Sequence, residues 1–275
     1  MNSPSAQVQQ ARELLPCYLA RLNISPAEPD RVLLERVMSG HLAQLPFASV
    51  SVRLGEPMPL ALPELLDRLV TRSRGGYCFE QNALLQAMLG ALGFETRLLL
   101  ARVIYDQDIH PGLTHRMMLV MLAGEAHVVD VGFGALGPRR PVPMSGEEIV
   151  DGWRRFRVAE SRGGEFRLQC LKDGRWFTLY RFELHRYGES DCELGHFYSH
   201  RHPAATFVNH LVAARLMPDR ILSLRGDALA IQTADGESEA RVADAQSLHR
   251  LLTTEFALAL SMDEAMALHS RLAVA

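Results

Sequence analysis

The sequence predicts an α+β protein in which helices come first, strands follow, and the last part mixes the two. Up to about residue 93, apolar residues recur at three- and four-residue spacings, the period of amphipathic helices. From Phe94 onward the spacing becomes that of strands, and after about residue 195 both patterns occur. With 275 residues, of which 48% are hydrophobic and 22% charged, the chain can bury a sizeable core. This order of blocks suggests a functional site where the helices meet the strands.

Four helices with one apolar face are expected in the N-terminal part, at 8–22, 30–45, 64–70 and 78–92. Pro16 is expected to end the first helix and begin a fresh one, because proline is favoured at the first helical position. Pro46 stops the second helix. Gly93 follows the fourth as its C′ residue.

Five strands are expected in the middle of the chain, at 97–105, 116–122, 127–131, 166–171 and 176–182. Short turns at Ala123-Gly124-Glu125 and at Asp173-Gly174 connect two pairs of them as hairpins. The last part is expected to hold a helix at 205–215, strands at 220–223 and 228–232, a turn at Asp235-Gly236, and two closing helices.

Charge and cysteine spacing exclude several classes of protein. Lys and Arg number 29 and Asp and Glu 32, a net charge of −3, so no overall positive field exists to bind nucleic acid or an anionic membrane. The longest fully apolar stretch, 117–123, is too short to span a bilayer, and the N-terminus lacks a secretory pattern, so we expect a cytoplasmic protein. Cys17, Cys78, Cys170 and Cys192 form no CxxC pair, which excludes redox dithiols and zinc knuckles. No pattern indicates an oligomeric state.

One cysteine, Cys78, stands at the first turn of the fourth predicted helix, after Gly75-Gly76-Tyr77. Unpaired N–H groups and the positive end of the helix dipole lie there, which favours thiolate over thiol. The same N–H groups can stabilise an oxyanion formed on an attacked carbonyl. The position therefore indicates a nucleophile. The alternative is a buried cysteine that packs as a small hydrophobic residue after a glycine turn.

A cysteine nucleophile needs a base and a group that orients the base. His115 begins one strand of the first predicted hairpin and Asp130 ends the other, and the two are roughly level when counted from the turn near residue 123. A carboxylate on one imidazole nitrogen would fix the tautomer and present the other nitrogen to Cys78. The alternative is an exposed strand-end histidine and a turn aspartate before Gly132.

These residues resemble the arylamine N-acetyltransferase family. Three of its signatures occur in order and at fitting spacings: Arg74-Gly75-Gly76-Tyr77-Cys78-Phe79-Glu80 with Asn82, Thr114-His115, and Asp130-Val131-Gly132-Phe133-Gly134. Further matches are Leu45-Pro46-Phe47, Ala101-Arg102-Val103, and the stretch from His202-Pro203 to Phe207-Val208, so the resemblance covers about residues 10–215. It implies a catalytic triad of Cys78, His115 and Asp130.

The resemblance also implies three domains: a helical domain at 1–93 that carries the nucleophile, a β-barrel at 94–195 that carries the histidine and aspartate, and an α/β lid at 196–275. It implies acetyl transfer from acetyl-CoA to an arylamine or hydrazine nitrogen, as in xenobiotic metabolism, by a ping-pong mechanism through an acetyl-cysteine and without a metal. The residues it places around the acceptor are Phe47, Val103, Thr114, Phe133, Gly134 and Phe207. Coenzyme A and a small aromatic amine or hydrazine are the expected partners, with no nucleic acid or membrane.

Two other functions would suit the same triad. A papain-like or transglutaminase-like hydrolase or amidase would release acid or ammonia and would need no CoA. A chain that kept only the scaffold would be a binding module or an amide synthase of a biosynthetic assembly line.

Two stretches depart from the family's pattern. The family usually continues the Pro-Phe motif with Glu-Asn, whereas this chain has Ala48-Ser49, so a polar anchor near the helix end is missing. The run 187–202 is also atypical. Both departures concern the acceptor and not the triad.

Residues 132–137 satisfy the GxGxxG pattern of dinucleotide sites. Pro138, Pro141 and Pro143 prevent the helix that this motif has to open, so the match is accidental. Arg139 and Arg140 follow directly, and either meet CoA phosphates or are solvated at the surface.

Cys192, His196, His200 and His202 invite a metal hypothesis. Their spacing fits no standard zinc pattern, and Pro203 breaks any helix that would align all four. We therefore expect a polar loop that lines the cleft, and no metal.

Overall fold

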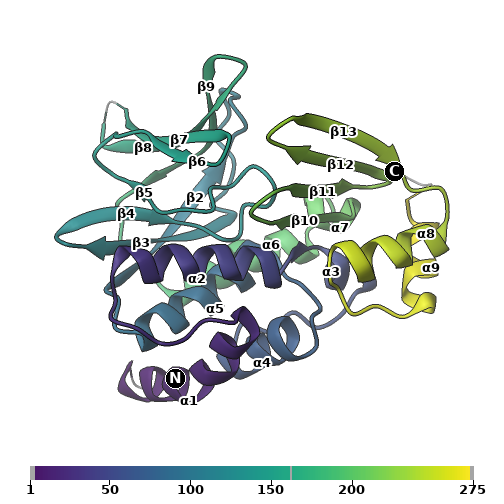
Figure 1. The fold of residues 1–275 in the computed structure, drawn as a ribbon, viewed down its shortest axis with the longest axis horizontal. Helices are drawn as coiled ribbons and strands as arrows, with labels where there is room; N and C mark the ends of the chain where they lie inside the picture. Colours follow the sequence, from purple (N-terminus) through teal and green to yellow (C-terminus); the bar gives the residue numbers. More distant parts are fainter. Residues whose placement is uncertain (1–3, 162, 273–275) are drawn as a thin grey trace.

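The N-terminal helices form a layer beneath a curved sheet in the computed structural model, which describes residues 4–161 and 163–272 (Figure 1). They are α1 (Pro4–Leu22), α2 (Arg31–Gln44), α3 (Val50–Leu54), α4 (Leu62–Leu66), which continues as a π-helical turn at Asp67–Thr71, and α5 (Cys78–Ala91). The second and fourth predicted helices are confirmed. Asp30 caps α2 by accepting from the Leu33 N–H at 2.7 Å, and Gly93, with φ of +95°, follows the end of α5.

The break predicted at Pro16 is wrong, because α1 runs through it. Ala11, Tyr18 and Leu22 are buried on both sides of the proline, whereas Pro16 lies on the exposed side of the helix. Proline has no N–H to donate, so one carbonyl group of the preceding turn lacks its helical partner, and on this exposed side water can donate to it instead. Packing of the apolar face therefore keeps the helix continuous.

The central sheet has the strand order β5-β4-β3-β2-β9-β8-β7-β6, and its neighbouring strands are antiparallel. Its strands are β2 (Thr96–Val103), β3 (His115–Leu122), β4 (Glu125–Val129), β5 (Val142–Pro143), β6 (Ile149–Asp151), β7 (Arg154–Glu160), β8 (Glu165–Lys172) and β9 (Arg175–Glu183). The sheet curls until β5 lies beside β7, which makes a nearly closed barrel. Leu99, Met117, Phe156, Leu168 and Leu179 fill its interior.

Both predicted hairpin turns are confirmed. Ala123 and Gly124 have φ of +50° and +85°, and Asp173 and Gly174 have φ of +51° and +76°. Two consecutive left-handed residues match the twist of antiparallel strands. The first of these turns fixes the register of β3 against β4, on which the site depends.

The C-terminal part holds a second antiparallel sheet and its own helices, to the right of the barrel in Figure 1. Its order is β1-β10-β11-β12-β13, made of β1 (Phe47–Ala48), β10 (Val212–Leu216), β11 (Ile221–Arg225), β12 (Ala228–Thr233) and β13 (Gly236–Arg241). The helices α8 (Ala245–Arg250), with a π-helical turn at Leu251–Glu255, and α9 (Met262–Ser270) close the chain as predicted. The sequence did not predict β13, whose side chains are all exposed, so no apolar alternation marks it.

The helix predicted at 205–215 is wrong. Only Thr206–Asn209 is helical, as α7, and β10 follows. Ala213 packs into the lid core, and Ala214 and Leu216 pack into the core of the N-terminal part. Alternate residues thus face opposite sides, as in a strand. Packing of both faces outweighs the helix propensity of alanine and leucine.

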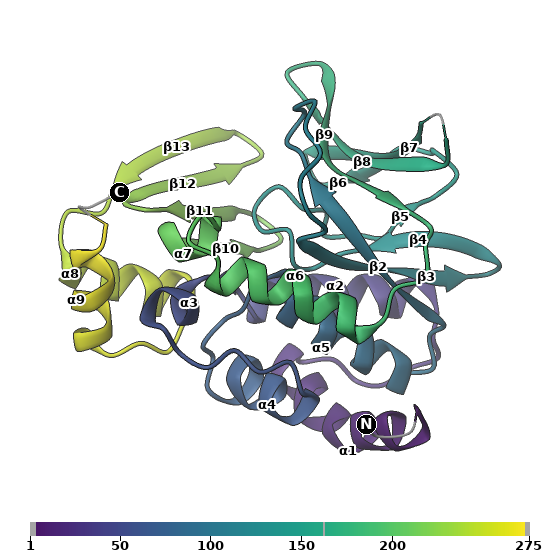
Figure 2. The same cartoon turned by 180° about the vertical axis from the view of Figure 1, so that it is seen from behind.

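The polar loop predicted at 192–202 is also wrong, because Glu189–Arg201 form a helix, α6. Its start is capped by the Asp191 side chain, which accepts from the Gly188 N–H at 2.8 Å. Figure 2 shows α6 running along the junction of the three parts. Three buried apolar clusters support a division into helical domain, barrel and lid, and the boundaries at 93 and 195 stay a prediction.

Among the helices of residues 4–161 and 163–272, none has both the length and the apolar character needed to cross a bilayer.

Candidate active site

Cys78 is the first residue of α5, as the sequence predicts. A Cβ on Gly75, which has φ of +67°, would lie 2.7 Å from Leu258 Cδ2 and 2.8 Å from Ala48 Cβ. Only glycine therefore permits this turn to pack against the lid. The side chain of Glu80 accepts from the Tyr77 N–H at 3.2 Å and is buried in an ion pair with Arg68. The turn that carries Cys78 is thus held from both sides.

His115 and Asp130 meet across the first barrel hairpin. Nε2 of His115 lies 2.7 Å from Oδ2 of Asp130, and both residues are buried. In the β3–β4 register Met118 lies opposite Val129, so Asp130 lies opposite Met117. Met117 and His115 are two residues apart on β3, so their side chains point to the same face of the sheet. The prediction that His115 and Asp130 face each other is confirmed, and their side chains bridge the offset of two residues between them.

Three donors orient the carboxylate of Asp130. Oδ2 bonds to His115, while Oδ1 accepts from Asn82 Nδ2 at 2.9 Å and from the Gly132 N–H at 2.8 Å. Asn82 also accepts from the Val131 N–H at 3.0 Å. Because Asn82 lies one helical turn after Cys78 on α5, it connects the helix that carries Cys78 to Asp130.

The imidazole of His115 connects Asp130 to Cys78. With Nε2 bonded to the carboxylate, Nδ1 is the nitrogen left to interact with Cys78, which lines the same cavity as His115. Burial opposes protonation of His115, but the charge and hydrogen bond of Asp130 outweigh it and raise the pKa of His115 from 6.5 to about 10. Burial alone would raise the pKa of Asp130, yet its contacts with His115, Asn82 and Gly132 lower it. The pair is therefore an imidazolium and a carboxylate at neutral pH.

These side chains reach a cavity of about 850 Å³ between the helical part, the barrel and the lid. Cys78 and His115 line it, and Sγ of Cys78 lies 3.6 Å from the Thr114 carbonyl oxygen. All six residues expected around an acceptor line the same cavity: Phe47, Val103, Thr114, Phe133, Gly134 and Phe207. Their role in binding stays a prediction.

Aromatic rings surround the imidazole. The rings of Tyr180 and Phe133 lie 4.9 and 5.2 Å from that of His115, centroid to centroid. Phe47 and Phe207 form a further pair at 5.6 Å. Aromatic rings therefore lie on both sides of the site, and those of Phe47, Phe133 and Phe207 border the cavity, which suits a flat ring.

Several cavity residues escaped sequence reasoning: Tyr105, Gln107, Tyr198, Ser199, Ser223 and Arg225. No motif marks them, since they come from a loop, from α6 and from β11. Asn82 could have been found, because it stands four residues after Cys78 on one helix.

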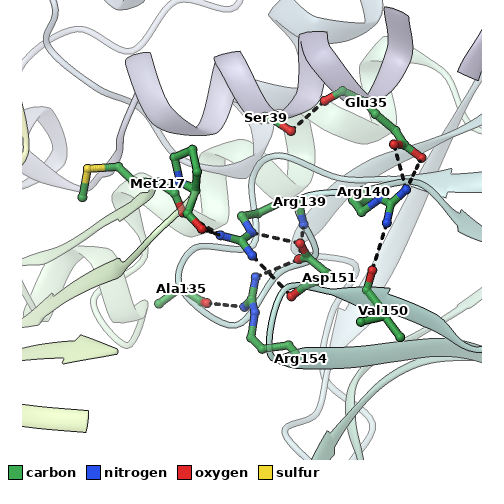
Figure 3. A network of polar contacts seen from close by, with 10 residues as sticks. Glu35, Ser39, Ala135, Arg139, Arg140, Val150, Asp151, Arg154 and Met217 are labelled. Atoms are coloured by element: carbon green, nitrogen blue, oxygen red, sulfur yellow. Dashed lines mark hydrogen bonds and ion pairs between the residues drawn. The ribbon is translucent and has the colours of Figure 1, made fainter. Parts of the chain in front are cut away.

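Arg139 is not solvated at the surface, whereas its contact with CoA phosphates stays a prediction. Figure 3 shows it bonded to Asp151, at 2.9 Å from Nε to Oδ1, and donating to the carbonyl oxygen of Met217 at 2.6 Å. Arg154 reaches the same carboxylate at 3.1 Å. Arg139 is buried and joins the barrel to the lid. Arg140 is half exposed and pairs with Glu35 at 2.9 Å.

The histidines of α6 have structural partners. His196 is buried, with Nε2 at 2.7 Å from the Met58 carbonyl oxygen and Nδ1 at 2.6 Å from the Tyr77 hydroxyl. Burial lowers the pKa of His196 to about 4, so it is neutral. Within residues 4–161 and 163–272, no three His, Cys, Asp or Glu side chains are grouped so as to hold a metal ion.

The position where the family's Glu-Asn is replaced lies beside a different polar anchor. Arg74 pairs with Glu56 and, at 2.9 Å, with Glu264 of α9. It also donates to the Ala259 carbonyl oxygen at 2.7 Å. The segment before Cys78 is thus tied to the lid by Arg74, and the effect of losing Glu-Asn at 48–49 stays a prediction.

A helix-borne cysteine and a barrel-borne histidine line one cavity, and a buried aspartate is bonded to the histidine, an arrangement typical of enzymes with a cysteine nucleophile. The sequence model of the N-acetyltransferase family matches residues 32–265. The chain belongs to the arylamine N-acetyltransferase family.

Its relatives cover nearly the whole chain. It is 32% identical over 252 residues to the arylamine N-acetyltransferase of Mycobacterium tuberculosis, with 89% of each chain covered. The structure of the arylamine N-acetyltransferase from Salmonella typhimurium matches with a TM-score of 0.89 and 29% identity, over 94% of this chain and 98% of that one. The Mycobacterium marinum arylamine N-acetyltransferase, solved in complex with CoA, matches with a TM-score of 0.87 and 29% identity over the same shares.

Proposed function

We propose that this protein transfers the acetyl group of acetyl-CoA to the nitrogen of an arylamine or arylhydrazine, with Cys78 as nucleophile, His115 as proton carrier and Asp130 as the group that orients it. The observation that carries the proposal is the buried hydrogen bond between His115 and Asp130, with His115 and Cys78 at the wall of one cavity. Relatives at about 30% identity are arylamine N-acetyltransferases, one of them solved with CoA, which supports the choice of donor.

In the first half-reaction, the proton resides on His115 and Sγ of Cys78 attacks the thioester carbonyl as a thiolate. An α-helix leaves its first N–H groups without partners in the helix, and those of α5 lie beside Cys78, where they can donate to the oxyanion. The intermediate collapses, the bond from carbon to the CoA sulfur breaks, and the CoA thiolate takes the proton from His115. The products are acetyl-Cys78, free CoA and a neutral imidazole.

In the second half-reaction, the amine nitrogen attacks acetyl-Cys78 while Nδ1 of His115 takes a proton from it. The carbon–sulfur bond then breaks and leaves the amide, the Cys78 thiolate and a protonated His115, which is the starting state. Donor and acceptor therefore occupy the site in turn, and the mechanism is ping-pong.

A flat aromatic acceptor suits the lining of the cavity. Phe47, Val103, Phe133 and Phe207 all line it, and we propose that they hold the ring while Thr114 and Gly134 border it. The four cysteines are free, which supports the proposal that the enzyme works in the cytoplasm, where thiols stay reduced.

Release of CoA in the absence of any acceptor tests the proposal. Purified protein mixed with excess acetyl-CoA should release one equivalent of CoA per active site in a burst, and slow turnover should follow only as water replaces the amine. Addition of a neutral arylamine should then restore continuous release and give parallel double-reciprocal plots. Fast continuous release without an amine would indicate a hydrolase, and no release would indicate a binding module.

A further inference from the structure

One charged side chain at the cavity takes no part in the chemistry above. Among the described residues that line the cavity, Arg225 is the only lysine or arginine, and none is an aspartate or glutamate. We propose that Arg225 binds a carboxylate carried by the aromatic acceptor, so that the enzyme prefers anionic arylamines such as aminobenzoates. This inference rests on the proposed function.

The strand that carries Arg225 explains why it faces the cavity. Along β11, Leu222 and Leu224 are buried in the lid core, whereas Ser223 and Arg225 line the cavity. Alternate residues of a strand point to opposite faces, so the lid core fixes the orientation of the cavity face. Arg225 pairs with Val212 of β10 and ends the strand before the hairpin turn.

Arg225 also lacks a carboxylate of its own. Two residues further on, Asp227 is engaged by Arg241 at 2.6 Å. No carboxylate of the described part of the chain lies within ion-pair distance of Arg225, and its side chain makes no hydrogen bond there. Arg74, Arg116 and Arg139, by contrast, each pair with a carboxylate. The guanidinium of Arg225 is thus available to a ligand.

Arg225 lines the same cavity as Cys78 and the aromatic side chains. An acceptor ring held in this cavity can present its amine to Cys78 and a carboxylate to Arg225. The planar guanidinium matches a carboxylate in a bidentate manner.

Two acceptors that differ only in charge test the inference: 4-aminobenzoate and its ethyl ester. The readout is the ratio of their kcat/KM values, acid over ester. In Arg225→Gln this ratio should fall about fivefold, the size expected for a solvent-exposed ion pair, and Arg225→Lys should restore part of it. Raising the salt concentration should lower the wild-type ratio and leave that of Arg225→Gln nearly constant. Arg250→Gln is the matched control, because Arg250 is an exposed lid arginine outside the cavity lining, and it should keep the wild-type ratio.

Arg225 could instead bind an anionic group of the acyl donor, and the same variant distinguishes these cases. If Arg225→Gln raises the KM for acetyl-CoA and leaves the acid-to-ester ratio unchanged, the arginine binds CoA phosphates and the inference is wrong. If it only lowers the use of malonyl-CoA relative to acetyl-CoA, the carboxylate belongs to the acyl group and the inference is again wrong. These outcomes are distinct from failure of the proposed function, in which the wild-type protein would acetylate neither 4-aminobenzoate nor its ethyl ester.

Discussion

Replacement of Asp130 by asparagine should disable the enzyme by reversing the tautomer of His115. Oδ1 of Asp130 accepts two hydrogen bonds, from Asn82 Nδ2 and the Gly132 N–H. An asparagine must keep its oxygen there, so its NH2 group points at Nε2 of His115. Nε2 then has to accept, and the proton moves to Nδ1, the nitrogen left to interact with Cys78. A neutral imidazole in this tautomer cannot take a proton from the thiol or the amine.

The magnitude follows from the pKa of His115. Its rise from 6.5 to about 10 corresponds to about 5 kcal/mol in favour of the imidazolium. Loss of this preference should slow CoA release from acetyl-CoA in a single turnover roughly 10³-fold. The control is Asp219→Asn, the same change at an exposed aspartate, which should keep the wild-type rate. A folded Asp130→Asn variant that retains a tenth of the wild-type rate would refute the reasoning.

The same pair gives stability a pH window. The His115 pKa is raised from 6.5 to about 10, so its contribution is complete below pH 6.5 and is lost as the pH rises toward 10. The Asp130 pKa is lowered, so its contribution is present above its ordinary value of 3.8 and is lost as the pH falls. The decrease in the free energy of unfolding caused by Asp130→Asn should therefore be largest between pH 3.8 and 6.5 and smaller at pH 9, as urea denaturation can measure. A decrease that grows with pH would contradict this.

Two further substitutions test the framework. Gly132→Ala would put a Cβ 2.5 Å from the Cα of Cys78, so it should lower the free energy of unfolding by about 1–3 kcal/mol in urea denaturation and slow CoA release. The control is Gly90→Ala in α5, the helix that carries Cys78, where a Cβ meets open space and the change should be neutral or stabilising. Asp151→Asn would leave Arg139 buried without its carboxylate and should cost about 3–5 kcal/mol of stability without a specific effect on the KM for acetyl-CoA. A raised KM with intact stability would instead assign Arg139 to CoA phosphates.

Local sequence signals predicted the parts of the site that depend on neighbours along the chain. Gly75 and Gly76 before a strong apolar helix located Cys78, and the turn at Ala123-Gly124 brought His115 and Asp130 together. Turn residues set the register of a hairpin, and apolar periodicity with glycine marks the start of a helix. Both signals can be read from a single sequence.

The rest depended on packing between distant segments. The stretch 205–215 has helix-forming residues, yet β10 forms because it pairs with β1 and β11, some 160 and 10 residues away in sequence. The polar run of α6 carries little apolar periodicity, so only its contacts at the junction make it helical. Arg225 stands in no motif, and its place at the cavity follows from the lid core behind β11. The buried pairing of Arg139 with Asp151 was equally invisible before the barrel strands were placed.

The central claim is that Cys78 carries the acetyl group between donor and acceptor. Peptide mass spectrometry after incubation with acetyl-CoA alone tests it directly, because every cysteine can be read in the same digest. We expect the mass of one acetyl group on the peptide with Cys78, none on those with Cys17, Cys170 or Cys192, and loss of this adduct when an arylamine is added. An unmodified Cys78 in protein that still acetylates the amine, or an acetyl group on another cysteine, would contradict the account.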